Sequence, residues 1–116
     1  MRRAVLKELE DVKAEEIVVI GLTGKSDIAD YMIVASGRSQ RQVGAAAERV
    51  RKAAKAVSGR AAAIEGMPAC DWVLIDTGDV IVHIFRPEVR EFYNLEKMWS
   101  ADFPLDAAGG ATEGAL

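Results

Sequence analysis

Four aspartates beside short apolar segments are the residues best suited to hold a divalent cation. They are Asp27, Asp30, Asp76 and Asp79. Carboxylate oxygens are the ligands that Mg²⁺ and Ca²⁺ prefer. Nothing in the spacing of the four aspartates requires them to meet. The sequence therefore predicts no metal site.

Residues 76–78 are Asp-Thr-Gly after an apolar segment, which resembles the active site of retroviral aspartic proteases. In that chemistry two aspartates share one proton, because two like charges so close together cannot both be ionised. Those proteases are almost entirely β-structure, whereas the periodicity of this chain predicts three helices. The Thr-Gly pair is explained equally well by a tight turn between two strands.

The segment 21–26 comes closest to a phosphate-binding loop, since it follows an apolar run and ends in Gly-Lys-Ser. A Walker loop needs four residues between its two glycines. Only Leu22 and Thr23 lie between Gly21 and Gly24, so this loop is too short to surround a phosphate.

Cys70 is the only cysteine and His83 the only histidine, which excludes an intrachain disulfide and the common zinc sites. His83 falls inside a predicted strand, where a hydrogen-bonded structural histidine is a commoner outcome than a catalytic base. Cys70 is followed by Asp71 and has no positively charged sequence neighbour to activate its thiol, so we expect it to be inert. We therefore expect no catalytic residues, no metal and no cofactor.

The composition indicates one domain of 116 residues, half of them apolar, with 15 basic and 18 acidic side chains and a net charge of −3. A chain of this length can bury a core without disulfides or metals. The acidic balance argues against a protein that binds nucleic acid chiefly through charge. No long apolar run is present, so we expect neither a signal peptide nor a membrane span, and a cytoplasmic location.

Apolar residues recur at helical spacing in three segments, at residues 2–14, at residues 39–57 and after Pro87. The second of these helices begins with Ser39 and Gln42 at the spacing of a capping box. One of its faces should pack on a sheet and comprises Val43, Ala47, Val50, Ala54 and Val57. The opposite face carries Arg41, Glu48, Lys52 and Lys55.

Strands are predicted at residues 17–20, 31–35, 72–76 and 80–85, with a short one in the Ala-rich segment 61–66. The first is β-branched and typical of a strand buried on both faces, and its short connector to the second predicts a hairpin.

A two-residue turn at Thr77 and Gly78 would place Asp76 opposite Asp79, Leu74 opposite Ile81 and Trp72 opposite His83. These residues share one face with Phe85. The other face would be entirely aliphatic and would pack under the long helix; it comprises Val73, Ile75, Val80, Val82 and Ile84.

The order of these elements and several strings resemble the ribosomal silencing factor family, also called the Iojap or RsfS family. The strings are GKSDIADYMI at residues 24–33, SGRSQRQV at 36–43, EG at 65–66, DWVLIDTGDVIVH at 71–83 and REFYNLEKMW at 90–99. The resemblance covers roughly residues 2–100. We accordingly expect a silencing factor domain at residues 1–103 and a disordered Ala/Gly-rich tail at residues 104–116.

The resemblance implies an α/β fold in which helices flank a mixed sheet, similar to nucleotidyltransferases but without their catalytic carboxylates. It also implies a translational repressor, not an enzyme. Such a protein binds the large ribosomal subunit through ribosomal protein L-fourteen and keeps the small subunit from joining. Members of the family are often dimeric when free. The alternative to a repressor is a metal-dependent enzyme of nucleotidyltransferase-like fold with Mg²⁺ held by Asp76 or Asp79, but the sequence has no Gly-Ser loop followed by the pair of metal-binding carboxylates of those enzymes.

Carried over by position, the partner-facing residues are Trp72, Asp76, Asp79, Tyr93 and Glu96. Aromatic anchors supply interface energy, and carboxylates suit a basic ribosomal protein. The alternative is that Trp72 and Tyr93 pack the last helix onto the sheet. A smaller contact to ribosomal RNA would involve Arg38, Arg41, Lys52 and Lys55.

Overall fold

A computed structural model of the chain describes residues 1–24 and 29–93. Its elements are α1 (Arg2–Asp11), β1 (Glu15–Gly21), β2 (Tyr31–Ser36), α2 (Gln40–Ser58), β3 (Ala63–Glu65), β4 (Trp72–Asp76), β5 (Val80–Phe85) and α3 (Pro87–Tyr93). The described strands form one five-stranded sheet in the order β1-β2-β5-β4-β3. Strands β2 and β5 are parallel and the other neighbours are antiparallel, so the predicted mixed α/β architecture is confirmed.

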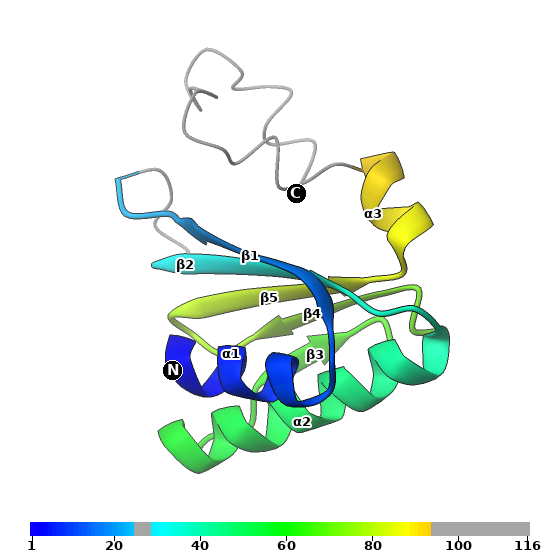
Figure 1. Ribbon diagram of the computed structural model, residues 1–116. Helices are drawn as coiled ribbons and strands as arrows, with labels where there is room; N and C mark the ends of the chain where they lie inside the picture. Colours follow the sequence, from blue (N-terminus) through cyan, green and yellow to red (C-terminus); the bar gives the residue numbers. More distant parts are fainter. Residues whose placement is uncertain (25–28, 94–116) are drawn as a thin grey trace.

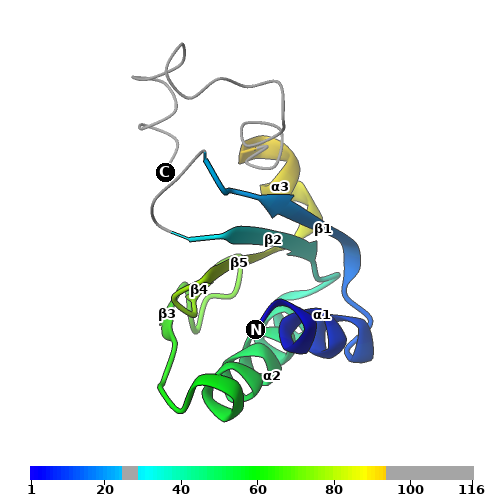
Figure 2. The ribbon, with the colours of Figure 1, turned by 90° about the vertical axis from the view of Figure 1, so that its left-hand side faces the viewer.

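Helices α1 and α2 lie against one face of the sheet, and α3 lies on the other side (Figure 1). Figure 2 shows the same layers from the side, with α1 and α2 together below the strands. The main core fills the space between these two helices and the sheet. It includes the aliphatic residues Val73, Ile75, Val80, Val82 and Ile84, which confirms the predicted face under the long helix.

The long helix α2 begins and ends where its sequence predicts. The Ser39 hydroxyl accepts a hydrogen bond from the Gln42 backbone N–H at 3.1 Å, and Gly59 ends the helix in the left-handed conformation. The Gln42 side chain reaches back as in a capping box but one residue too far, since its Oε1 accepts a hydrogen bond of 2.6 Å from the Arg38 N–H instead of the Ser39 N–H. Its NH2 group donates to the carbonyls of Val12 and Lys13 at 3.0 and 3.2 Å. It thereby ties the end of α1 to the start of α2.

The predicted apolar stripe of α2 is correct except at its end. Val43, Ala47, Val50 and Ala54 are fully buried, whereas Val57 is 55% exposed. Residues 55–60 are all exposed, so the last turn of the helix extends beyond the sheet.

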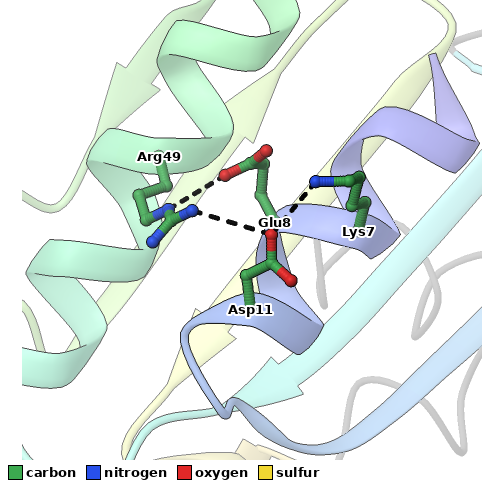
Figure 3. Close-up of polar contacts among 4 residues, drawn as sticks. All are labelled: Lys7, Glu8, Asp11 and Arg49. Carbon is green, nitrogen blue, oxygen red and sulfur yellow. Dashed lines mark hydrogen bonds and ion pairs between the residues drawn. The ribbon is translucent and has the colours of Figure 1, made fainter.

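A network of charged side chains joins the outer surfaces of α1 and α2 (Figure 3). The Arg49 guanidinium on α2 contacts Glu8 at 2.9 Å and Asp11 at 3.7 Å, and Lys7 reaches Asp11 at 3.2 Å. These groups are partly exposed to water, which limits what each pair contributes to stability. The network aligns the two helices, and the apolar core beneath them supplies most of the free energy that holds them on the sheet.

No residue of the first strand is fully buried, so the prediction that it is buried on both faces is wrong. Strand β1 pairs only with β2, and the register of that pair shifts between Glu15 and Val18. Its side chains alternate in exposure, and Val19 is 39% exposed. The predicted antiparallel hairpin of β1 and β2 is confirmed.

The register of the β4–β5 hairpin differs from the prediction by two residues. Asp76 lies opposite Ile81, Leu74 opposite His83 and Trp72 opposite Phe85. A two-residue hairpin turn would need a positive φ at Thr77, which a β-branched residue resists, and only Gly78 adopts one. Because the shift is even, the predicted strand residues still share a face, whereas Asp79 lies in the loop before β5.

Candidate partner-binding face

The side of the sheet opposite α1 and α2, here called the second face, carries the residues that the sequence singles out. It is formed by Trp72, Leu74 and Asp76 of β4 and by Ile81, His83 and Phe85 of β5. Phe85 and His83 are buried, whereas Trp72, Leu74, Asp76 and Ile81 are half-buried. The second face is therefore a partly accessible apolar surface that ends in a carboxylate.

Three aromatic rings pack together at one end of the second face. The Trp72 and Phe85 rings are stacked, with centroids 4.9 Å apart and planes 24° apart. The His83 ring lies 5.9 Å from Trp72 and 5.8 Å from Phe85. The Trp72 indole Nε1–H donates a hydrogen bond of 3.0 Å to His83 Nδ1. These contacts give Trp72 a defined orientation.

His83 is a structural residue, as its place in a strand predicts. It is 2% exposed, and burial lowers the pKa of its imidazole from 6.5 to about 4. The ring is therefore neutral at physiological pH, and because Nδ1 accepts from Trp72, its proton lies on Nε2. Sequence reasoning placed Trp72 and His83 directly across from each other; the structure joins them diagonally, through their side chains.

Three aspartates occupy neighbouring backbone positions at the other end of the second face. The Asp76 side chain accepts a hydrogen bond of 2.9 Å from the Gly78 N–H, and the Asp30 N–H donates to the Asp79 carbonyl at 2.8 Å. Asp30 and Asp79 are exposed and Asp76 is half-buried. Within the described part of the chain, none of the three forms an ion pair and no cluster of acidic, His and Cys side chains could hold a metal ion.

The structure brings some of the predicted partner-facing residues together and leaves others undefined. Trp72 and Asp76 lie at the two ends of β4 on the same face, and Asp79 lies in the loop that follows. Tyr93 is the last described residue of α3, and only its backbone is described. Glu96 and Asp27 lie outside the described residues, as do the predicted tail at 104–116 and the later part of the last helix.

Arg90 is a residue that sequence reasoning missed. Its guanidinium is 6% exposed and donates a hydrogen bond of 2.7 Å to the Ser36 hydroxyl at the end of β2. Nearby, the Arg86 side chain contacts the Asp71 carboxylate at 2.9 Å. Together these arginines hold α3 against the sheet beside Phe85. Nothing in the local charge pattern distinguishes Arg90 from an exposed arginine, because the serine that it contacts lies 54 residues earlier.

Cys70 is buried, with its Sγ 3.4 Å from Met67 Sδ. It also explains Gly44 inside α2, since a Cβ at that position would lie 3.1 Å from Cys70 Sγ. In the described residues, no helix is long and apolar enough to cross a membrane.

Comparison with known proteins points to one family. The sequence pattern of the family described as "Ribosomal silencing factor during starvation" (RsfS) matches residues 1–113. The ribosomal silencing factor RsfS of Zymomonas mobilis is 58% identical over 97 residues, which are 84% of this chain and 73% of that protein. A mouse protein named "Mitochondrial assembly of ribosomal large subunit protein 1" is 35% identical over 95 residues, 79% of this chain and 42% of its own.

A crystal structure of a Chromobacterium violaceum protein has the same fold. It superimposes with a TM-score of 0.82 at 35% sequence identity and covers 89% of this chain and 86% of its own. The arrangement of sheet and helices is therefore one already seen in a solved structure.

Proposed function

Since this chain belongs to the ribosomal silencing factor family, we propose that it represses translation by binding ribosomal protein L-fourteen on the large ribosomal subunit. The bound protein occupies the surface that the small subunit needs, so the subunits do not join. Repression by occupancy involves no turnover and needs neither a cofactor nor a metal. The proposal places the protein in the cytoplasm, as a homodimer when it is free.

The observation that supports this proposal most strongly is the composition of the second face. A half-buried tryptophan and two half-buried aliphatic residues, Leu74 and Ile81, offer apolar area to a partner. The carboxylates of Asp76 and Asp79 border that area and have no cation of their own among the described residues. An aromatic anchor with an acidic rim suits a basic protein surface.

Tyr93 and Glu96 extend the proposed surface along the last helix. Arg90 fixes α3 to Ser36, and this anchor lies three residues before Tyr93. We assign both residues to the same partner as Trp72, with Glu96 adding a further carboxylate for a basic side chain. Single substitutions, Tyr93→Ala and Glu96→Gln, in the binding assay below test the two assignments separately.

Truncating Trp72 to alanine is expected to weaken binding to purified large subunits by about 2 kcal/mol, or roughly 30-fold, because a buried aromatic anchor would be lost. Cosedimentation with separated small subunits, large subunits and joined ribosomes measures the effect, and wild-type protein should bind large subunits alone. Circular dichroism checks that the variant is folded. The matched control is Val57→Ala, which removes an exposed apolar side chain on the opposite side of the sheet.

Two results would contradict this proposal. A folded Trp72→Ala protein that binds large subunits at full strength would remove Trp72 from the interface. If wild-type protein bound no ribosomal particle, and instead bound a nucleotide with Mg²⁺ in a manner lost in Asp76→Asn, the nucleotidyltransferase alternative would replace the silencing function.

A smaller contact to ribosomal RNA is part of the proposal and involves the outer face of α2. Arg41, Lys52 and Lys55 are exposed and form no ion pair among the described residues. Arg38, by contrast, contacts Glu15 at 3.0 Å. Helix α2 carries one acidic side chain, Glu48, so its outer face is basic although the whole chain is acidic.

The RNA contact predicts a change in salt dependence. Each phosphate contact contributes about 0.7 to 0.9 to the slope of log affinity against log salt concentration. The double variant Lys52→Gln/Lys55→Gln is expected to reduce the slope for large subunits by about 1 to 2. Arg3→Gln/Lys7→Gln makes the same change in net charge on α1 and should leave the slope unaltered. Equal slopes for all three proteins would contradict the RNA contact.

A further inference from the structure

We propose that His83 is a positioning residue for partner binding, because it accepts the indole hydrogen bond of Trp72 and so holds the ring in its binding orientation. This inference rests on the proposed function of Trp72. It gives the only histidine of the chain a role in partner recognition, which is separate from catalysis and from packing of the core.

Among the described residues, Phe85 and His83 orient the Trp72 ring. Stacking on Phe85, at 4.9 Å and 24°, restricts the plane of the indole. The hydrogen bond of 3.0 Å from Nε1 to His83 Nδ1 then distinguishes between the two ways in which the ring could be turned within that plane. A tryptophan side chain has two rotatable bonds, and these contacts restrict both of them.

The choice of histidine at position 83 needs an explanation beyond packing. The side chain is 2% exposed on an apolar sheet, where an aliphatic or phenyl group would be buried at lower cost. What imidazole adds at this position is a hydrogen-bond acceptor aimed at the indole. Burial keeps the pKa of the ring low, so Nδ1 retains its lone pair.

A fixed indole benefits the proposed interface in two ways. The side chain loses less conformational freedom when a partner binds, since its rotamer is already defined. In addition, the indole N–H is already satisfied within the protein, so the partner need not supply an acceptor for it. Trp72 can then contact the partner through its apolar ring.

The test compares His83→Phe, which keeps a ring and removes the acceptor, with His83→Asn, whose side-chain oxygen replaces Nδ1. Both are made in the full chain and assayed for binding to large subunits beside wild type and Trp72→Ala. We expect His83→Phe to bind about 5- to 10-fold more weakly and His83→Asn to retain most of the affinity. Circular dichroism and thermal melting show whether each variant is folded.

A second measurement reports on the hydrogen bond itself. The indole N–H of Trp72 is identified in NMR spectra by its absence from Trp72→Phe, and its hydrogen exchange is measured in each protein. We expect slow exchange in wild type and His83→Asn and exchange at least about 10-fold faster in His83→Phe. Fast exchange in wild type would overturn the inference even if His83→Phe failed to fold.

The outcomes separate this inference from the proposed function. If Trp72→Ala weakens binding and a folded His83→Phe does not, the positioning role is wrong and the interface stands. Equal losses in His83→Asn and His83→Phe would also overturn it, because the acceptor would not matter. If Trp72→Ala binds like wild type, the proposed interface itself fails.

Discussion

Replacing Gly66 by alanine is expected to destabilise the folded protein by about 4 kcal/mol, a large share of the stability of a domain of this size. Gly66 lies directly after β3 and has a φ of 100°, which L-residues rarely adopt. A Cβ there would lie 2.1 Å from the carbonyl oxygen of Trp72. That oxygen belongs to the backbone of β4, so it cannot move aside as the end of a flexible side chain could.

The expected loss combines two physical costs. A strained backbone angle contributes about 1 to 3 kcal/mol, and forcing β3 and β4 apart contributes a similar amount. Urea unfolding followed by circular dichroism measures the total. Because the displaced strand carries Trp72, the variant should also lose affinity for the large subunit under conditions in which it remains folded.

Gly78 provides a matched control for the close approach. Its φ is 105°, yet a Cβ at this position would meet no atom within 4 Å. Gly78→Ala therefore introduces the backbone strain without the steric clash, and we expect it to lower the free energy of unfolding by about 1 kcal/mol. If Gly66→Ala and Gly78→Ala proved equally destabilising, the tight contact between Gly66 and β4 would be refuted.

Local sequence patterns predicted the elements of this fold well because their causes are local. The stripe on α2 and the aliphatic positions of β4 and β5 repeat with the periods of a helix and a strand. Ser39 and Gly59 mark the ends of α2 through hydrogen bonds and backbone angles within a few residues. Such features depend little on the rest of the chain, so a single sequence reveals them.

The errors concern contacts between distant or competing groups. The apolar run in β1 fits a central strand equally well, and only the parallel pairing of β2 with β5 leaves it at an edge. The register of the β4–β5 hairpin depends on the Thr77 hydroxyl, which accepts from the Val80 N–H at 3.2 Å and donates to the Val80 carbonyl at 2.8 Å. Because the Thr77 side chain hydrogen-bonds to backbone groups of the loop, the two-residue turn expected from the sequence does not form.

The candidate site shows the same division. Trp72 and Asp76 could be placed on one face of a strand from the alternation of side chains alone. Their surroundings could not be predicted. The link from Trp72 to His83 runs diagonally between strands, and Arg90 reaches a serine 54 residues away. Sequence reasoning thus identified residues of the surface and missed the groups that orient them.

Acidification is expected to destabilise the protein by about 3 kcal/mol between pH 7 and pH 4 through His83 alone. The pKa of His83 falls from 6.5 in the unfolded chain to about 4 in the folded protein. Between these values the unfolded state binds more protons, so stability is fully present above pH 6.5 and is lost as the pH falls toward 4. Protonation of Nδ1 would also remove the acceptor that holds Trp72.

Carboxylates titrate in the same range, so the contribution of His83 is obtained as a difference between two proteins. Urea unfolding of wild type and His83→Asn at pH 7, 5.5 and 4.5 cancels the carboxylates that they share. Wild type should lose progressively more stability than the variant as the pH falls, because asparagine does not titrate. Parallel pH profiles would mean that His83 is solvated enough to accept a proton in the folded state, and its burial beneath Trp72 would be disproved.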